Sequence, residues 1–564
     1  MRRIGGIGLG LALMASSALA QQRAAPPTPP PAKVETSKPP ELVVPQKRVT
    51  RHSGTFGGQR MNYSATIGET IIKAEDGTPK AAIVTTSYVR EPRDPNRPVT
   101  FLFNGGPGSG SVWLQMGAFG PKRVAIPSNG TDDGAPPYPI LDNPDSLLDV
   151  TDLVFIDPPG TGFSRLLGKT EGKEFYGVTA DARAVAEVIR RWIGDNGRWN
   201  SPKYLGGESY GTSRSAAVVN QLANATYNDV ALNGVILIST ILDFGAGADR
   251  PGNELSNITN LPSMAAAAHF HGKAPEGPLE PFLDEARAWA IGPYATALLK
   301  GQKLQGEERT QIRRQLARFT GLSETYLDQA DLRVSADRFY KQLLRDRGLS
   351  IGRLDARYTG KDYDSAGENY DNDPSFYGID AGYTAAINAW SRGPLGFVTD
   401  REYQSIGNLG RDWDWKIEGG RDANAYLNLT PYLGTALREN SGLKIFVGQG
   451  YYDFATPFFA AEYALSRSGI PQDRVEYHYY QSGHMMYVRD ADRSKLTADV
   501  RGFIRRRRGL AQHAPDPHRA GVEEQPERDG DDDVRHDRID PHRELRNARR
   551  IGHLVHDPHD RADQ

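Results

Sequence analysis

The chain has 564 residues, 38% of them hydrophobic, and a formal net charge of −2. This length supports a large core, either in about two to four domains or in one α/β domain with insertions. A net charge near zero argues against a general nucleic-acid binder. The absence of cysteine excludes disulfides, cysteine nucleophiles and thiolate metal sites.

Residues 1–20 have the pattern of an export signal. Two arginines precede an apolar, glycine-rich run, and Ala18-Leu19-Ala20 forms a small-x-small cleavage site. The alternative is a membrane anchor, but the apolar run is short for a span. We therefore expect an exported protein, periplasmic or secreted after cleavage, with no stable membrane span. Residues 21–47 are rich in proline and predict an extended tether.

Short apolar strands alternate with helical patterns through residues 48–243, which we interpret as the first part of an α/β core. Such alternation predicts a mostly parallel central sheet flanked by helices. Strand-like runs begin near Met61, and a helical pattern covers Ala180–Ile193. The clearest strand patterns are Ala82–Val89, Thr100–Phe103, Leu153–Ile156, Tyr204–Gly206 and Gly234–Ser239.

Ser209 lies in Gly207-Glu208-Ser209-Tyr210-Gly211, directly after an apolar strand and before a helical pattern that runs from Thr212 to about Ala223. This is the G-x-S-x-G nucleophile elbow in its required strand–turn–helix context. The helix N-terminus faces the same point and favours negative charge there. The alternative is an ordinary glycine-rich loop, since the chain contains 60 glycines.

Between residues 244 and 435 the alternation of strands and helices gives way to helical and loop-rich patterns. We interpret this segment as a largely helical cap insertion. Helical patterns cover Leu279–Leu299 and Glu307–Phe319, whereas residues 350–435 are rich in Asp, Tyr and Gly. Residues 436–508 return to strand patterns and complete the core. Residues 509–564 are highly charged and almost free of aromatics, which predicts a disordered tail.

Two polar clusters could suggest a metal site, but we expect neither to bind one, and no cofactor is predicted. Seven of the twelve histidines lie in the charged tail, where Pro558 interrupts any helix. The acidic loop of the insertion has a spacing that does not match an EF-hand, so we expect it to be solvated. Its acidic residues are Asp362, Asp364, Asp371 and Asp373.

A serine nucleophile requires a base and a group that orients the base. His484 is the best candidate base, because it follows the Val475–Tyr480 strand in a loop at the strand's carboxyl end. Asp453 follows the Leu443–Val447 strand and precedes the histidine, as the acid of an α/β-hydrolase does. The other histidines before the tail are His52, His269, His271 and His478, of which the last is interpreted as structural. Asp157 also ends a strand, but it precedes the serine and adjoins a Pro-Pro turn.

Acyl transfer also requires an oxyanion hole. The backbone amide of Tyr210, directly after the nucleophile, is expected to supply one donor. A second is expected from the loop Asn104-Gly105-Gly106-Pro107-Gly108, where glycines let a backbone amide approach the substrate. A phosphate-binding loop is the alternative, but no Gly-Lys-Ser/Thr follows.

Five sequence blocks together resemble the serine carboxypeptidase family. They run in family order from about residue 100 to 490 and are Asn104-Gly105-Gly106-Pro107-Gly108, Gly162-Phe163-Ser164, Gly207-Glu208-Ser209-Tyr210-Gly211, Asp453-Phe454 and Gly483-His484-Met485.

The resemblance implies an α/β-hydrolase fold and a serine-type carboxypeptidase that acts on peptides through an acyl-enzyme. It implies a triad of Ser209, Asp453 and His484. The oxyanion hole would be formed by the amides of Gly106 and Tyr210, and Asn104, Gly105 and Glu208 would recognise the substrate's C-terminal carboxylate.

The chain departs from the family at two positions. The family's second acidic residue falls at Ala118, and the cysteine usual in the early loop is Ser109. Glu208 can face a substrate carboxylate only if the two share a proton, which would give a preference for acidic pH. The loss at Ala118 weakens the predicted carboxylate-binding network.

Three alternatives remain open from the sequence. An exported aminopeptidase of the proline iminopeptidase type would use a similar glycine loop and the same residue order. An esterase or acyltransferase could use the same scaffold. A non-catalytic binding module is the alternative from a different class, but it would have no need of Ser209, Asp453 and His484 together.

Overall fold

The computed structural model describes residues 43–224, 228–407, 409–417 and 426–512. The predicted export signal, most of the predicted tether and the chain beyond Gln512 lie outside these residues. Within the described part, no helix has the length and apolar character needed to cross a membrane.

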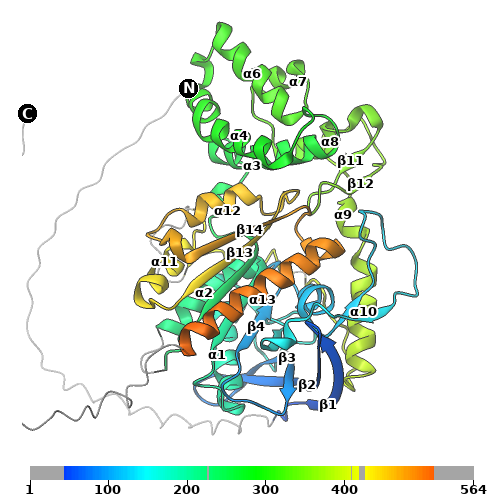
Figure 1. Ribbon diagram of the computed structural model, residues 1–564, viewed down its shortest axis with the longest axis vertical. Helices are drawn as coiled ribbons and strands as arrows, with labels where there is room; N and C mark the ends of the chain where they lie inside the picture. Colours follow the sequence, from blue (N-terminus) through cyan, green and yellow to red (C-terminus); the bar gives the residue numbers. More distant parts are fainter. Residues whose placement is uncertain (1–42, 225–227, 408, 418–425, 513–564) are drawn as a thin grey trace, which may run out of the picture. The chain divides into compact units, whose positions relative to one another are not determined.

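A ten-stranded sheet forms the centre of the protein, in the order β1-β2-β3-β7-β4-β9-β10-β13-β14, with β8 paired to β3 (Figure 1). Strands β7 to β14 along this path run parallel to one another, whereas β1, β2 and β3 form an antiparallel extension. The strands of this sheet are β1 (Lys47–Phe56), β2 (Gln59–Lys73), β3 (Pro79–Glu91), β4 (Val99–Phe103), β7 (Asp152–Ile156), β8 (Arg165–Leu166), β9 (Lys203–Ser209), β10 (Gly234–Thr240), β13 (Lys444–Gly450) and β14 (Val475–Tyr480).

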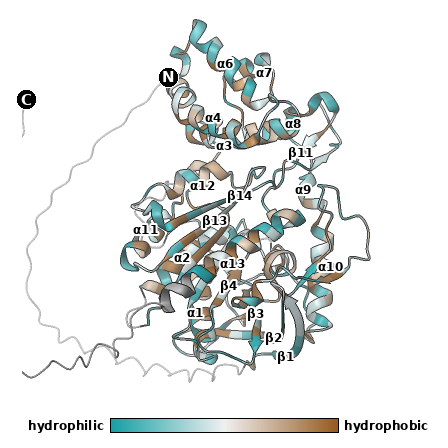
Figure 2. Ribbon diagram, viewed as in Figure 1, coloured by the Kyte–Doolittle hydropathy of each residue, from teal (hydrophilic) through white to brown (hydrophobic). Residues whose placement is uncertain are grey.

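Helices cover both faces of this sheet, because successive strand residues point to opposite sides. In β10, Ile236 and Ile238 pack with one apolar cluster, while Val235 and Leu237 pack with the other. The first cluster contains residues of α10 (Asp380–Arg392) and α13 (Asp490–Gln512). The second contains residues of α1 (Val178–Asp195), α2 (Tyr210–Ala223), α11 (Thr430–Glu439) and α12 (Phe458–Leu465). Hydrophobic residues accordingly follow the central strands in Figure 2. The predicted α/β-hydrolase fold is confirmed by this architecture.

A helical group lies between β10 and β13 in sequence and has a core of its own. Its helices are α3 (Glu254–Phe270), α4 (Leu279–Trp289), α5 (Ala295–Lys300), α6 (Gly306–Thr320), α7 (Glu324–Gln329) and α8 (Ala336–Gln342). Figure 1 shows the labelled members of this group together, apart from the helices that flank the sheet. The short strands β11 (Ser350–Ile351) and β12 (Thr359–Gly360) follow, and then α9 (Pro374–Tyr377). Another short pair, β5 (Lys122–Val124) and β6 (Ile140–Asp142), lies between β4 and β7.

The structure differs from the sequence-based expectations at three places. The first strand begins at Lys47, well before Met61, because the outer face of β1 is polar and exposed and gives no apolar signal. The helix expected over Leu279–Leu299 is broken by a wider turn that contains Pro293, which lacks a backbone donor. The loop-rich segment after residue 350 contains α10 and the start of α11, both of which pack on the sheet.

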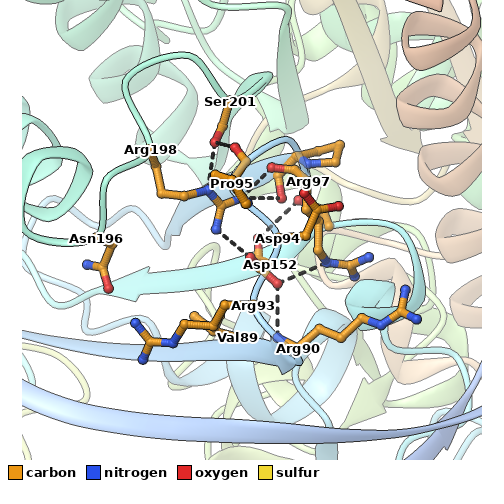
Figure 3. A network of polar contacts seen from close by, with 12 residues as sticks. Val89, Arg90, Arg93, Asp94, Pro95, Arg97, Asp152, Asn196, Arg198 and Ser201 are labelled. Atoms are coloured by element: carbon orange, nitrogen blue, oxygen red, sulfur yellow. Dashed lines mark hydrogen bonds and ion pairs between the residues drawn. The ribbon is translucent and has the colours of Figure 1, made fainter.

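A buried polar network fixes the amino-terminal ends of the central strands (Figure 3). The carboxylate of Asp152, the first residue of β7, binds Arg97 Nε at 2.9 Å and Arg198 Nη1 at 2.6 Å. It also accepts the backbone N–H of Arg90 at 3.1 Å. Nε of Arg198 donates to Ser201 Oγ at 2.6 Å. The charges of Asp152, Arg97 and Arg198 are therefore paired with one another. This network lies at the end of the sheet opposite to Ser209, which is at the carboxyl end of β9.

Candidate active site

Ser209 is the last residue of β9 and precedes the first turn of α2. Its backbone has φ 60° and ψ −131°, a strained conformation for a residue with a side chain. Glycine is required around it, because a Cβ on Gly207 would lie 2.0 Å from the carbonyl oxygen of Gly211. Ser209 is half-buried between the buried residues Glu208 and Tyr210. The turn thus leaves Ser209 partly exposed and buries its two neighbours.

The structure brings Asp453 and His484 together at the carboxyl ends of β13 and β14. Nδ1 of His484 lies 2.8 Å from Oδ2 of Asp453, and Asp453 is fully buried. The other carboxylate oxygen accepts the backbone N–H groups of Ala455 and Thr456 at 2.8 and 3.0 Å. The Thr456 hydroxyl donates to Oδ2 at 2.6 Å. Asp453 is therefore held in one orientation, and it fixes the imidazole so that Nε2 is the free nitrogen.

Several effects act in opposite directions on the pKa of His484. Burial and the cation of Arg353 lower this pKa, but the charge and hydrogen bond of Asp453 and the charge of Glu208 together raise it above the ordinary value. The raised pKa means that the neutral imidazole, which is the form able to accept a proton, is lost as the pH falls through it. Among the described residues the Ser209 hydroxyl has no hydrogen-bond partner, so it is not joined to His484 in this state. Such bonds are often long or absent before substrate binds.

The loop Asn104–Gly108 lies directly against the elbow. A Cβ on Gly105 would lie 2.5 Å from the backbone nitrogen of Tyr210, so only glycine fits there. Gly106 has φ +100°, in the region that favours glycine. Tyr210 begins α2, and the first N–H groups of a helix have no partner within the helix. The two segments predicted to supply oxyanion donors are therefore in contact.

Glu208 is buried beside the nucleophile. Its Oε2 accepts the hydroxyl of Tyr487 at 2.8 Å, and the Asn104 side chain is a further hydrogen-bond partner. Burial raises the pKa of Glu208 to about 7, against the opposing effects of His484 and of the two hydrogen bonds. A carboxyl with this pKa is largely protonated in mild acid and can then donate a hydrogen bond.

A cleft of about 780 Å³ adjoins these residues. Thr456 and Thr240 line it on the side of the candidate triad, and Arg353 and Trp415 line it elsewhere. Among the described residues its lining does not include Ser209 or His484. The Trp415 ring packs edge-on against the ring of Tyr210, with centroids 5.8 Å apart. The cleft therefore begins next to the elbow and leads away from it.

The remaining candidates lie apart from this site or have structural partners. His478 stacks on Phe446 and pairs with Asp499, and His52 lies on β1 beside Thr50. Asp157 accepts hydrogen bonds from the Ser111 backbone and the Tyr403 hydroxyl, and burial raises its pKa to about 6. The ring nitrogens of His269 and His271 face backbone carbonyls of Gly277 and Ala356.

A lysine of α8, Lys341, lies among the carboxylates of the acidic loop. Nζ of Lys341 donates to Asp362 at 2.6 Å and to the backbone oxygen of Asp364 at 2.7 Å. Asp371 accepts the backbone N–H of Tyr363, and Asp373 caps α9. Within the described ranges, no group of three or more His, Cys, Asp and Glu residues could hold a metal ion.

Sequence reasoning missed several residues that support the site. Thr456 could have been found, because an Asp followed three residues later by Thr is typical of a turn closed by side-chain bonds. The bond from Tyr487 to Glu208 gives no local signal, because the two residues lie 279 positions apart. The Ser239 hydroxyl, which donates to the backbone oxygen of His484 at 2.6 Å, gives no sequence signal.

The strand order and the strand–turn–helix elbow are those of the α/β-hydrolase fold. Residues 87–250 match the family model described as serine carboxypeptidase. It contains the Asn104–Gly108 loop and the elbow, whereas Asp453 and His484 lie beyond it. No curated protein sequence matches the chain.

Solved structures similar to this chain include several hydrolases. A loop variant of the haloalkane dehalogenase DbeA-M1 from Bradyrhizobium elkanii is 14% identical over 82% of this chain and 99% of its own, with a TM-score of 0.31. The Aspergillus niger epoxide hydrolase is 13% identical over 78% of each chain, with a TM-score of 0.31. A thermostable carboxyl esterase from Bacillus coagulans is 12% identical over 78% of this chain and 98% of its own, with a TM-score of 0.30.

Proposed function

We propose that the protein is a serine-type carboxypeptidase that releases C-terminal residues from peptides. The observation that carries this proposal is the hydrogen-bonded pair Asp453–His484, at 2.8 Å, at the sheet edge where β9 presents Ser209. The family match of residues 87–250 supports a peptide substrate. The pattern of residues 1–20 supports export, to the periplasm or outside the cell.

The proposed reaction is an acyl transfer in two halves. Ser209 Oγ attacks the carbonyl carbon of the last peptide bond while Nε2 of His484 accepts its proton. The amides of Gly106 and Tyr210 donate to the resulting oxyanion. The tetrahedral intermediate then collapses, the C–N bond breaks, and His484 returns the proton to the leaving amine. Water repeats the sequence on the acyl-enzyme and frees Ser209.

Selection of a free C-terminus is proposed to depend on Glu208 and Asn104, as the family resemblance implies. A pKa of about 7 lets Glu208 stay protonated in mild acid and donate to the substrate carboxylate. In its ionised form it would repel that carboxylate. The family's second acidic residue is replaced by Ala118, which has no carboxyl group. Glu208 accepts a hydrogen bond from the Tyr487 hydroxyl instead.

The acyl part of the peptide is proposed to occupy the cleft that begins at Thr240 and Thr456. The cleft begins next to the elbow and leads away from it on the side of Trp415, which supports this placement.

The test compares three peptides of the same sequence: one blocked only at its N-terminus, one amidated only at its C-terminus, and one blocked at both ends. Release of the last residue from the N-blocked peptide, together with labelling of Ser209 by a fluorophosphonate, is the expected result. His484→Ala should abolish both, whereas the control His478→Ala changes a ring stacked on Phe446 and should retain both. Release of the first residue from the amidated peptide alone would instead identify an aminopeptidase. Hydrolysis of esters alone would identify an esterase, and a folded protein that is not labelled would be a binding module.

A further inference from the structure

A fully buried ion pair lies beneath the nucleophile elbow. Nε of Arg214, on α2, donates to Oδ2 of Asp181, on α1, at 2.6 Å. The two side chains are 0% and 2% exposed. Burial raises the pKa of the Asp181 carboxyl, and the guanidinium of Arg214 opposes that rise. A buried ion pair usually adds little to stability, because the cost of removing both charges from water offsets much of their mutual attraction. Its place under the elbow is therefore not explained by stability alone.

The same guanidinium contacts both segments of the candidate oxyanion hole. Its Nη1 donates to the backbone oxygen of Asn104 at 2.6 Å. That oxygen belongs to the peptide unit whose N–H is on Gly105, directly before Gly106. The guanidinium carbon also lies 5.3 Å from the centre of the Tyr210 ring and 5.5 Å from that of Phe103.

The planar guanidinium can connect these groups rigidly, because its donors have a fixed geometry. Asp181 fixes one edge of the plane, so the direction of the bond to Asn104 is fixed as well. The Asn104 side chain is held separately, since its Oδ1 accepts the backbone N–H of Leu114 at 3.1 Å. Rotation of the Asn104–Gly105 peptide unit would therefore break a charge-assisted hydrogen bond inside the core.

We propose that Arg214 is a positioning residue that, anchored by Asp181, holds the Asn104–Gly105 peptide unit against Tyr210 so that the oxyanion donors converge. This inference rests on the proposed function, because it assumes that Ser209 forms an oxyanion there. Arg214 does not touch the substrate. Its effect should appear when the tetrahedral intermediate forms, and not when the peptide binds.

The molecule offers a matched control in the network of Figure 3. Arg198 is also a buried arginine paired with a buried aspartate, Asp152, but it lies at the amino-terminal end of the strands. Arg198→Met should lower the melting temperature without changing kcat of the folded protein. A purely structural role for Arg214 would give the same pattern.

The experiment uses the full chain with two changes at the site. The double variant Arg214→Met with Asp181→Leu removes both buried charges, which proteins often tolerate. Arg214→Lys keeps the charge but loses the planar fork. In both we expect kcat for an N-blocked peptide to fall by about 10- to 100-fold while KM stays within about twofold. The inhibition constant of a peptidyl boronic acid, whose tetrahedral adduct places an oxygen in the hole, should rise by the same factor.

Unchanged kcat and unchanged boronic acid inhibition in a folded variant would overturn the proposal, as would a loss confined to KM. If the double variant does not fold, the comparison of Arg214→Lys with Arg198→Met decides between the same outcomes. Failure of the proposed function is a separate result, since wild-type protein would then not release the last residue of the N-blocked peptide.

Discussion

Replacing Glu208 with glutamine removes a carboxyl whose ionisation the folded protein opposes. Burial raises the pKa of Glu208 from 4.5 to about 7, while the shape of the side chain and the hydrogen bond from Tyr487 can be retained by the amide. This difference in pKa corresponds to about 3.4 kcal/mol. The contribution of Glu208 to stability is fully present below pH 4.5 and is lost as the pH rises through about 7. Between pH 5 and pH 8 the wild-type protein should therefore lose about 2.5 kcal/mol that Glu208→Gln does not lose.

The assay is denaturant unfolding of both proteins at pH 5 and pH 8. Effects of all other groups largely cancel in the difference between the two proteins, and Glu187→Gln, a change in the half-buried pair with Arg191, serves as the control. The same variant should also shift activity. Glu208 raises the pKa of His484, so the acid limb of kcat/KM for an ester substrate should move to lower pH. A stability difference between variant and wild type that is equal at both pH values would refute the reasoning.

Ser209→Ala is expected to abolish fluorophosphonate labelling and to lower kcat by roughly four to six orders of magnitude, with an unchanged circular dichroism spectrum; normal turnover in the folded variant would exclude a serine nucleophile. Arg353→Met removes a cation that lowers the pKa of His484, so the acid limb of kcat/KM should move to higher pH, and a limb that stays in place would contradict this. A chelator should leave Tm unchanged, because Lys341 already occupies the acidic loop, and a clear drop would reveal a bound cation. Truncation after Gln512 should leave turnover and Tm nearly intact; loss of folding would show that the tail packs on the core.

The inner strands of the parallel part of the sheet could be predicted because they are buried on both sides and contain short apolar runs. The Leu153–Ile156 and Gly234–Ser239 patterns correspond to β7 and β10 with boundaries that differ by one residue. Strand β1 could not be predicted in this way, since residues such as Arg48 and Arg51 are exposed and its pairing with β2 comes from the backbone. Helix α10 was also not predicted from the sequence, because its apolar positions lie in a segment rich in Asp, Tyr and Gly.

The chemical groups of the site could be predicted from motifs, but their supports could not. The elbow and the glycine loop have local signatures, and the chain order of acid and base follows from the fold. The contact between Arg214 and Asn104 joins residues 110 positions apart, and that between Tyr487 and Glu208 joins residues 279 apart. No local pattern encodes such pairs, because each depends on how separate segments pack.

The inserted segment around Leu354 is joined to both loops that carry the acid and the base. The backbone N–H of His484 donates to the oxygen of Leu354 at 2.6 Å, and that of Phe454, next to Asp453, donates to the oxygen of Arg353 at 3.1 Å. Ala356 in turn donates to the oxygen of Tyr452 at 3.0 Å. The insertion is therefore not a module that can be exchanged between relatives without consequence. A chimera that imports foreign helices must retain residues 353–356 of this chain, or it will lose the backbone bonds that hold the loops of Asp453 and His484.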